Sequence, residues 1–260
     1  MSVTALNHPT PWPEVNVVLR RLLTDVQAIL GNNFIGMYLY GSLASCDFNT
    51  RRSDIDFVVV TTVQLPGDLL PELDAMHARM MMSGMKWATK LEGSYVPLHV
   101  LRRYEPDEQP CPNINEGNFG VNGLGSDWII HRHVIRENGV VVAGPDPRTL
   151  IDPVQPKDLQ KAVLATLNEW WLPILQDDTR LRSSVYQSYA VLIMCRALYT
   201  LRYGRLVSKT AAARWAQERL DGKWTGLIGQ ALAWPDGKQS DEFTETLDFI
   251  RYTLDRSQQL

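Results

Sequence analysis

The sequence has little cysteine and no long hydrophobic run. Its 260 residues include only Cys46, Cys111 and Cys195, and none of them belongs to a CxxC pair. We therefore expect neither a disulfide framework nor a zinc site. No apolar stretch approaches the length of a membrane span, and the first residues lack the basic and then apolar order of a signal peptide. These absences predict a cytoplasmic protein with no membrane partner.

An excess of positive charge is also missing. The formal net charge is −3, whereas general nucleic-acid binders are usually strongly basic. We therefore expect no nucleic-acid partner, and a partner that is either cationic or carries negative charge that a metal ion neutralises. The hydrophobic fraction of 45% is sufficient for a large core, and the length suits one large domain or two ordinary ones.

The first half of the chain combines helical and strand patterns. Ser42 is expected to cap a short helix, and the Pro-, Asn- and Gly-rich segment 106–125 is expected to be a long loop. The spacing of apolar residues predicts helices over 14–30, 68–82 and 126–137, and strands over 34–40, 55–61, 90–101 and 140–143.

The second half shows helical patterns alone. Four prolines between Gly144 and Pro156 mark a domain boundary. We therefore predict an α/β domain over residues 1–156 and an all-α helical bundle over residues 157–260. The expected helices of the second domain are 157–176, 182–203, 209–220, 225–234 and 240–257.

Two short motifs flank the predicted strand 55–61 and suggest one chemistry. Asp54 and Asp56 are two residues apart, so their side chains project from the same face of an extended segment. Two adjacent carboxylates repel each other, and a bound Mg²⁺, which prefers carboxylate and phosphate oxygens, removes that conflict. Gly41 and Ser42 form a small turn whose backbone N–H groups can approach a phosphate. Together these residues predict transfer of a nucleotidyl group.

Glu92, on the next predicted strand, is a third candidate carboxylate. It shares one strand face with Ser94 and Val96. If the sheet places Glu92 beside the two aspartates, it is a candidate base for a substrate hydroxyl. An edge charge or a hydrogen-bonded structural group is an equally good interpretation from the residues alone.

Two cations in the helical half suggest phosphate binding. Ser208 is a good N-cap, so Lys209 lies in the first turn of a helix. A cation there opposes the helix dipole unless an anion binds nearby. Arg196 lies among apolar residues, where an unpaired guanidinium would be costly. The alternative is that Arg196 pairs with a carboxylate such as Asp54 or Glu92, and that Lys209 is merely exposed.

These motifs resemble known nucleotidyltransferases. The Gly-Ser and Asp-x-Asp residues resemble the superfamily of DNA polymerase β type. The helical half resembles the aminoglycoside adenylyltransferases that modify streptomycin and spectinomycin, in which a tyrosine-rich helix precedes a Gly-Arg-x-x-Ser-Lys-x-x-Ala-Ala-x-Trp segment. The matching residues here are Gly204, Arg205, Ser208, Lys209, Ala212, Ala213 and Trp215.

The resemblance implies a polymerase-β-like domain with a mixed sheet, Mg²⁺ as cofactor and ATP as co-substrate. It implies that AMP is transferred to a hydroxyl of a small, cationic molecule. Asp54, Asp56 and Glu92 would hold the metal, and Glu92 would also be the base. The residues expected to bind the triphosphate are Gly41, Ser42 and Ser53 in the first domain and Arg196 and Lys209 in the second.

The chain departs from the family at the antibiotic site. Tyr186 and Tyr189 stand where acidic and histidine side chains are expected, and Asp177 and Asp178 are candidate replacements for acceptor contacts. We expect a monomer. Two alternatives stay open: a nucleotidyltransferase with another acceptor, whether small molecule, protein or RNA, and a nucleotide-binding sensor that performs no transfer. The intact set of three carboxylates disfavours the sensor, because a pure binder needs no base.

Overall fold

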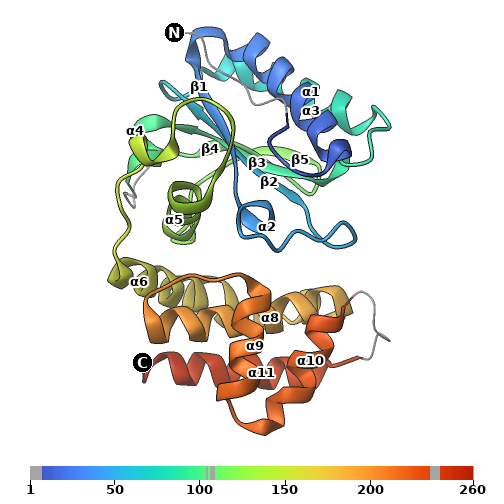
Figure 1. The fold of residues 1–260 in the computed structure, drawn as a ribbon, viewed down its shortest axis with the longest axis vertical. Helices are drawn as coiled ribbons and strands as arrows, with labels where there is room; N and C mark the ends of the chain where they lie inside the picture. Colours follow the sequence, from blue (N-terminus) through green and yellow to red (C-terminus); the bar gives the residue numbers. More distant parts are fainter. Residues whose placement is uncertain (1–7, 104, 106–108, 235–240, 260) are drawn as a thin grey trace. The chain divides into compact units, whose positions relative to one another are not determined.

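The computed structural model describes residues 8–103, 105, 109–234 and 241–259. The chain forms two compact units, Met1–Pro153 and Val154–Leu260 (Figure 1). The boundary between the two units lies between Pro153 and Val154. It is within the proline-rich segment that predicts a domain boundary between residues 156 and 157. Each unit has its own architecture and is described separately.

The first unit is built on a mixed sheet. Its α-helices and strands are, in chain order, α1 (Pro13–Leu30), β1 (Phe34–Leu39), α2 (Gly41–Ala44), β2 (Ile55–Thr61), α3 (Leu70–Met81), β3 (Leu91–Pro97), α4 (Leu98–Arg102), β4 (Cys111–Asn115), β5 (Asn118–Asn122), α5 (Trp128–Asn138) and β6 (Val140–Ala143). The six strands have the order β5-β4-β3-β2-β1-β6. Strands β2 and β3 are parallel, and the other neighbours are antiparallel.

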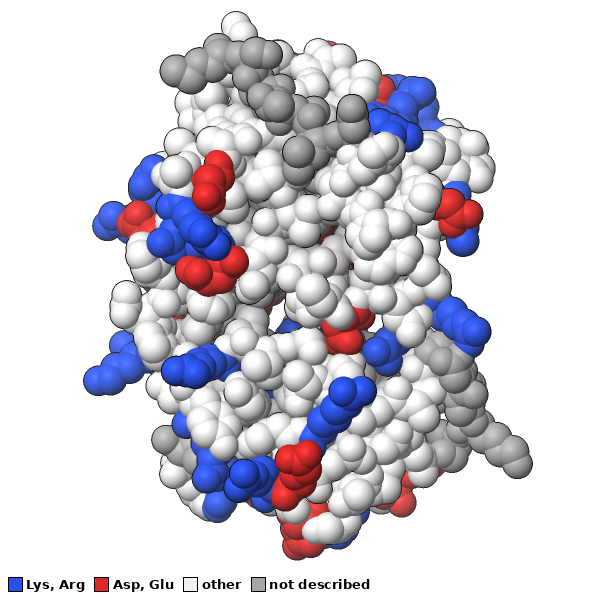
Figure 2. Space-filling model, in the orientation of Figure 1, with Lys and Arg blue, Asp and Glu red and all other residues white. Residues whose placement is uncertain are grey.

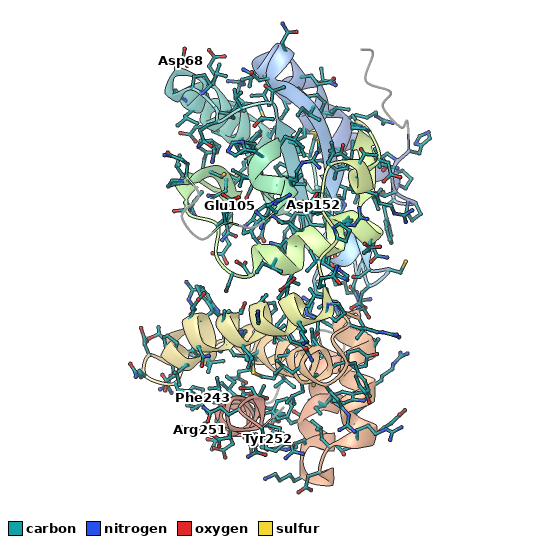
Figure 3. All side chains as sticks on the ribbon, turned by 90° about the vertical axis from the view of Figure 1, so that its left-hand side faces the viewer. Asp68, Glu105, Asp152, Phe243, Arg251 and Tyr252 are labelled. Atoms are coloured by element: carbon teal, nitrogen blue, oxygen red, sulfur yellow. The ribbon has the colours of Figure 1, made fainter. Side chains whose placement is uncertain are left out.

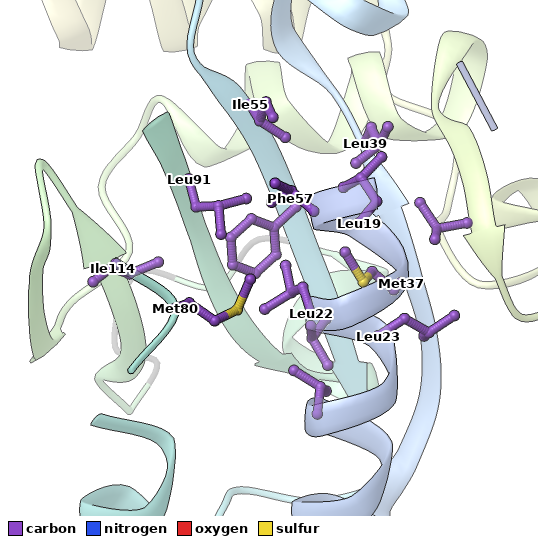
Figure 4. Close-up of a cluster of buried hydrophobic side chains, with 14 of the residues drawn as sticks. Leu19, Leu22, Leu23, Met37, Leu39, Ile55, Phe57, Met80, Leu91 and Ile114 are labelled. Carbon is purple, nitrogen blue, oxygen red and sulfur yellow. The ribbon is translucent and has the colours of Figure 1, made fainter. Parts of the chain in front are cut away.

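Both faces of β2 are buried, because successive strand residues point to opposite sides. On one face, Phe57 belongs to a cluster with Leu19 of α1 and Met80 of α3 (Figure 4). On the other face, Val58 belongs to a cluster with Trp128 of α5. The strand is therefore fixed from both sides, which sets the positions of the polar residues at its start.

Two of the elements predicted for the first unit differ from those in the structure. The segment expected to be a loop contains the hairpin β4–β5, whose turn residues Glu116 and Gly117 both have positive φ. The sequence hides this hairpin because Asn, Pro and Gly interrupt the usual strand pattern. The strand expected over 90–101 ends at Pro97, and α4 follows it directly. Residues 104 and 106–108 lie outside the described part of the chain.

All regular elements among the described residues of the second unit are helices. Its elements are α6 (Pro156–Thr166), the π-helix η5 (Leu167–Trp171), α7 (Leu172–Ile174), the 3-10 helix η6 (Thr179–Arg182), α8 (Ser184–Tyr203), α9 (Lys209–Arg219), the 3-10 helix η7 (Gly222–Trp224), α10 (Thr225–Ala233) and α11 (Phe243–Ser257). Helix α8 is the longest and buries Cys195, Leu198 and other apolar residues. On α11, the ring of Tyr252 (labelled in Figure 3) lies parallel to that of Phe249.

The mixed sheet and the helices that follow it confirm the expected fold class. The helix expected over 157–176 is interrupted by η5, where the hydrogen-bonding pattern widens for one turn. Ser240, the expected start of the last helix, lies outside the described residues. None of the helices described here is long and apolar enough to cross a membrane. On the face drawn in Figure 2, basic and acidic side chains are intermixed.

Candidate active site

Asp56 and Glu92 are direct partners in the register of the parallel strands β2 and β3. Partners in register project to the same face of a sheet, so the two carboxylates lie side by side. Asp54, two residues earlier, follows the same alternation at the start of β2. All three are half-buried. The structure therefore brings Glu92 next to the Asp-x-Asp pair, and the catalytic roles of the three residues stay predictions.

Gly41 lies against one side of this cluster of three carboxylates. Its φ is +60°, in the left-handed region that favours glycine. A Cβ placed on Gly41 would overlap Oδ2 of Asp56. The backbone N–H of Tyr40 also donates to the carbonyl of Asp56 at 3.0 Å. The Gly-Ser turn and the Asp-x-Asp motif, 12 residues apart in the sequence, are thus in direct contact.

The pKa of Glu92 is raised to about 7, from a usual value of 4.5. Burial is the largest cause, and the negative charges of Asp54, Asp56 and Glu116 raise the pKa further, whereas Lys90 lowers it. A carboxyl group with a pKa near neutrality can exchange a proton at physiological pH. This property is suited to removing a proton from a substrate hydroxyl.

Tyr40 lies behind the carboxylates and responds to their charge. Burial is the main reason why its pKa is well above 10, and the nearby charges of Asp56, Asp127 and Glu92 raise it further. Its phenol therefore stays neutral. The Tyr40 ring packs against His131 of α5, with centroids 5.0 Å apart, so α5 covers this side of the group.

Two further charged residues near these carboxylates, Lys90 and Glu116, are not among the site residues predicted from the sequence. Lys90 Nζ is 3.0 Å from Oδ1 of Asp54, and the Lys90 side chain is 52% exposed. Glu116 belongs to the β4–β5 turn. Lys90 directly precedes the motif strand, which is a signal that could have identified it. No local signal relates Glu116 to Glu92, because the missed hairpin brings them together.

The donor set suits Mg²⁺ bound together with a nucleotide. Within the described ranges, no three His, Cys, Asp or Glu side chains form a group able to hold a metal ion. Mg²⁺ usually binds through one or two carboxylates plus substrate phosphates rather than in an all-protein cage. Asp54 and Asp56 fit that mode, because side chains two residues apart in an extended segment project to the same face and their mutual repulsion calls for a cation.

Ser42 and Ser53 occupy different surroundings. Ser42 lies inside α2 rather than at its N-cap, which is Tyr40, so the expected capping role is wrong. The Ser42 hydroxyl oxygen is buried and has no hydrogen-bond partner among the described residues. The Ser53 hydroxyl accepts a 2.9 Å hydrogen bond from the backbone N–H of Asn49. A phosphate oxygen would satisfy the Ser42 hydroxyl.

The second unit carries the predicted phosphate-binding cations. The Ser208 hydroxyl accepts a 3.1 Å hydrogen bond from the backbone N–H of Ala211, so the predicted N-cap is confirmed. Lys209 is the first residue of α9, and Arg196 is a half-buried residue of α8. The positive end of a capped helix and a lysine beside it form a suitable environment for an anion.

The residues predicted to contact the acceptor molecule are two tyrosines of α8 and two aspartates that precede η6. Tyr186 and Tyr189, one turn apart on α8, have ring centroids 5.6 Å apart. Asp177 accepts a 2.5 Å hydrogen bond from the hydroxyl of Thr179, and Asp178 pairs with Arg182 at 3.1 Å. Both aspartates are thus engaged in local contacts beside η6 (Thr179–Arg182).

Comparison with known proteins relates both units to one group of enzymes. Residues 149–258 match the family described as the aminoglycoside adenylyltransferase C-terminal domain. An aminoglycoside (3'') (9) adenylyltransferase of Rhizobium radiobacter is 30% identical over 92% of this chain and 91% of its own length. The enzyme of the same name from Escherichia coli is 26% identical over 92% of this chain and 93% of its own length.

A spectinomycin 9-adenylyltransferase of Staphylococcus aureus is 26% identical over 81% of this chain and 88% of its own length. Among solved structures, a spectinomycin adenyltransferase from Enterococcus faecialis with ATP and spectinomycin matches with a TM-score of 0.72. The match covers 93% of this chain and 98% of that one, at 18% identity. At that identity the structural match supports a shared fold.

Proposed function

This chain belongs to the aminoglycoside adenylyltransferase family, and we propose that it transfers AMP from ATP to a hydroxyl of an aminoglycoside-type antibiotic such as streptomycin or spectinomycin. The observation that carries the proposal is the register of Asp56 with Glu92, beside Gly41. It supports a base next to a site for Mg²⁺ and phosphate, as nucleotidyl transfer requires.

Glu92 is the base of the proposed reaction. Its carboxylate takes the proton of the acceptor hydroxyl, and the hydroxyl oxygen forms a bond to the α-phosphorus of ATP. The bond between that phosphorus and the oxygen bridging to the β-phosphate breaks, and its electrons leave with pyrophosphate. The raised pKa of Glu92, about 7, makes the carboxylate a better proton acceptor than an ordinary glutamate.

Asp54 and Asp56 hold the metal in this proposal, and Glu92 lies within its surroundings. Mg²⁺, when bound, polarises the phosphoryl oxygens and stabilises the charge that develops during transfer. Gly41 leaves room beside Asp56. The buried Ser42 hydroxyl donates to the triphosphate, and Ser53 is a further proposed triphosphate contact.

The helical unit supplies positive charge for the pyrophosphate group. Arg196 and Lys209 bind its oxygens and thereby stabilise the leaving group. Lys209 lies within residues 149–258, which match the aminoglycoside adenylyltransferase C-terminal domain, and this match supports the role. Tyr186, Tyr189, Asp177 and Asp178 are proposed acceptor contacts. Their rings and carboxylates suit a cationic acceptor.

The proposal is tested by measuring pyrophosphate release with ATP, Mg²⁺ and a panel that contains streptomycin, spectinomycin and chemically unrelated hydroxyl compounds. We expect turnover with an aminoglycoside-type acceptor, and its loss in Asp56→Asn. Tight ATP binding without turnover of any antibiotic would overturn the proposed acceptor. Turnover with an unrelated compound would then identify a different acceptor, and no turnover at all would favour the sensor.

A further inference from the structure

Tyr189 presents an aromatic ring to the cation that begins α9. The ammonium of Lys209 lies 5.0 Å from the centroid of this ring, within the range of a cation–π interaction. The ring is 41% exposed, so burial alone does not explain its presence. The contact joins the second turn of α8, the second unit's longest helix, to the first residue of α9.

The Tyr189 ring packs against two other aromatic rings, one of which is buried. Its centroid lies 5.6 Å from that of Tyr186 and 6.1 Å from that of Trp171. Trp171 is 2% exposed and is the last residue of the π-helix η5. Trp170, its neighbour in the same turn, donates from its indole N–H to the Tyr186 hydroxyl at 3.2 Å. The ring is thus supported by Tyr186 of its own helix and by Trp171 of η5.

Lys209 needs such support for two physical reasons. A cation in the first turn of a helix is opposed by the positive end of the helix dipole. A free lysine side chain also samples many rotamers, and ordering it on a ligand has an entropic cost. An aromatic face attracts the ammonium and reduces both effects.

We infer that Tyr189 is a positioning residue, which holds the Lys209 ammonium ready to bind the triphosphate of ATP. The inference rests on the proposed function, because that function assigns Lys209 to the phosphates. It gives the Tyr189 ring a role in nucleotide affinity, which is separate from the acceptor contact considered above. The hydroxyl of Tyr189 has no part in this role.

A double-mutant cycle tests the inference in the full-length protein. The dissociation constant of a non-hydrolysable ATP analogue with Mg²⁺ is measured for Lys209→Met, Tyr189→Leu and the double variant. We expect Lys209→Met to weaken binding by about tenfold and Tyr189→Leu by about two- to fivefold. The double variant should bind no more weakly than Lys209→Met, because the ring acts through the lysine.

Two further variants separate positioning from general structure. Tyr189→Phe keeps the aromatic face and should retain wild-type affinity. Tyr203→Leu removes a comparably exposed tyrosine of α8, 44% exposed with Arg202 5.6 Å from its ring, and should leave affinity unchanged. Circular dichroism and thermal unfolding establish that each variant is folded.

The outcomes distinguish this inference from the proposed function. Additive losses in the double variant, or a change in the KM for the acceptor alone, would overturn the positioning role. Unchanged affinity in Lys209→Met would also overturn it, and would remove Lys209 from the phosphate site. AMP transfer by the wild-type protein is measured separately. If the double-mutant cycle gives the expected affinities but no AMP is transferred, only the proposed reaction is contradicted.

Discussion

At Gly41, backbone conformation and side-chain contact both exclude a larger residue. We expect Gly41→Ala to lower the rate of AMP transfer by about 100-fold, because the added Cβ must displace the Asp56 carboxylate. Gly84→Ala is the matched control. Gly84 also has a positive φ, +73°, but nothing lies within 4 Å of an added Cβ. Steady-state kinetics should show a large loss only for Gly41→Ala, and equal losses would contradict the contact argument.

The charges around Glu92 give a prediction with a definite sign. In the metal-free protein the Glu92 carboxyl should lose its proton near pH 7. Carbon NMR of the Glu92 carboxyl as a function of pH measures this pKa. Lys90→Met removes a cation that favours the carboxylate, so the pKa should rise. Glu116→Gln removes a negative charge that disfavours it, so the pKa should fall. Shifts in the same direction for both variants would contradict the proposed arrangement.

Among the helices and strands, the sequence predicts those with a continuous apolar pattern and does not predict those with an irregular one. Strand β2 has the bounds expected from its β-branched run, and α9 begins at Lys209, directly after its N-cap Ser208. The hairpin β4–β5 was missed because its turn, Glu116-Gly117, lacks the usual Asn-Gly or Asp-Gly signal. The expected third strand ran too long because Leu98–Arg102 is apolar enough to extend either element.

Helix α3 and strand β3 are joined by a buried hydrogen bond with a pH-dependent consequence. His77 Nε2 lies 2.8 Å from the Tyr95 hydroxyl, and burial lowers the pKa of His77 to about 4. The unfolded chain, with a histidine pKa near 6.5, therefore binds more protons between pH 6.5 and pH 4. Stability should fall as the pH is lowered through this window, by about 2 kcal/mol from pH 7 to pH 5.

Urea unfolding at both pH values, monitored on the first unit, measures this effect. His77→Phe serves as the control, because it keeps an aromatic side chain and cannot bind a proton. The difference between pH 7 and pH 5 should be about 2 kcal/mol smaller in His77→Phe than in the wild type. An equal difference in both proteins would show that His77 does not cause the acid sensitivity.

The start of α9 depends on a single side-chain cap. Ser208→Ala removes the hydrogen bond to the Ala211 N–H and should destabilise the second unit by about 1 kcal/mol. Ser208→Asp retains a capping oxygen and should restore most of this stability. Denaturant unfolding of the three proteins tests the cap. A loss in Ser208→Asp as large as that in Ser208→Ala would indicate that the hydroxyl contributes by another route.

For the whole molecule, the sequence predicts which residues carry the chemistry better than how they meet. Gly41, Asp54 and Asp56 are recognisable from local motifs. The partnership of Asp56 with Glu92 depends on the parallel pairing of β2 and β3, and residues 36 apart carry no local signal for such a register. Lys90 and Glu116 influence the pKa of Glu92. Their proximity to it depends on side-chain contacts and on the hairpin β4–β5, which the apolar pattern of the sequence does not predict.

The central claim is that Glu92 is the base of an AMP transfer to an antibiotic hydroxyl. Transfer of labelled AMP from ATP to streptomycin and spectinomycin tests it most directly, with wild type, Glu92→Gln and Glu116→Gln compared at pH 8. Glu116→Gln removes the same charge from the nearby hairpin turn and should stay within a few-fold of wild type. Glu92→Gln should lose about 100- to 10,000-fold in rate and still bind ATP. Full activity in Glu92→Gln would contradict the account.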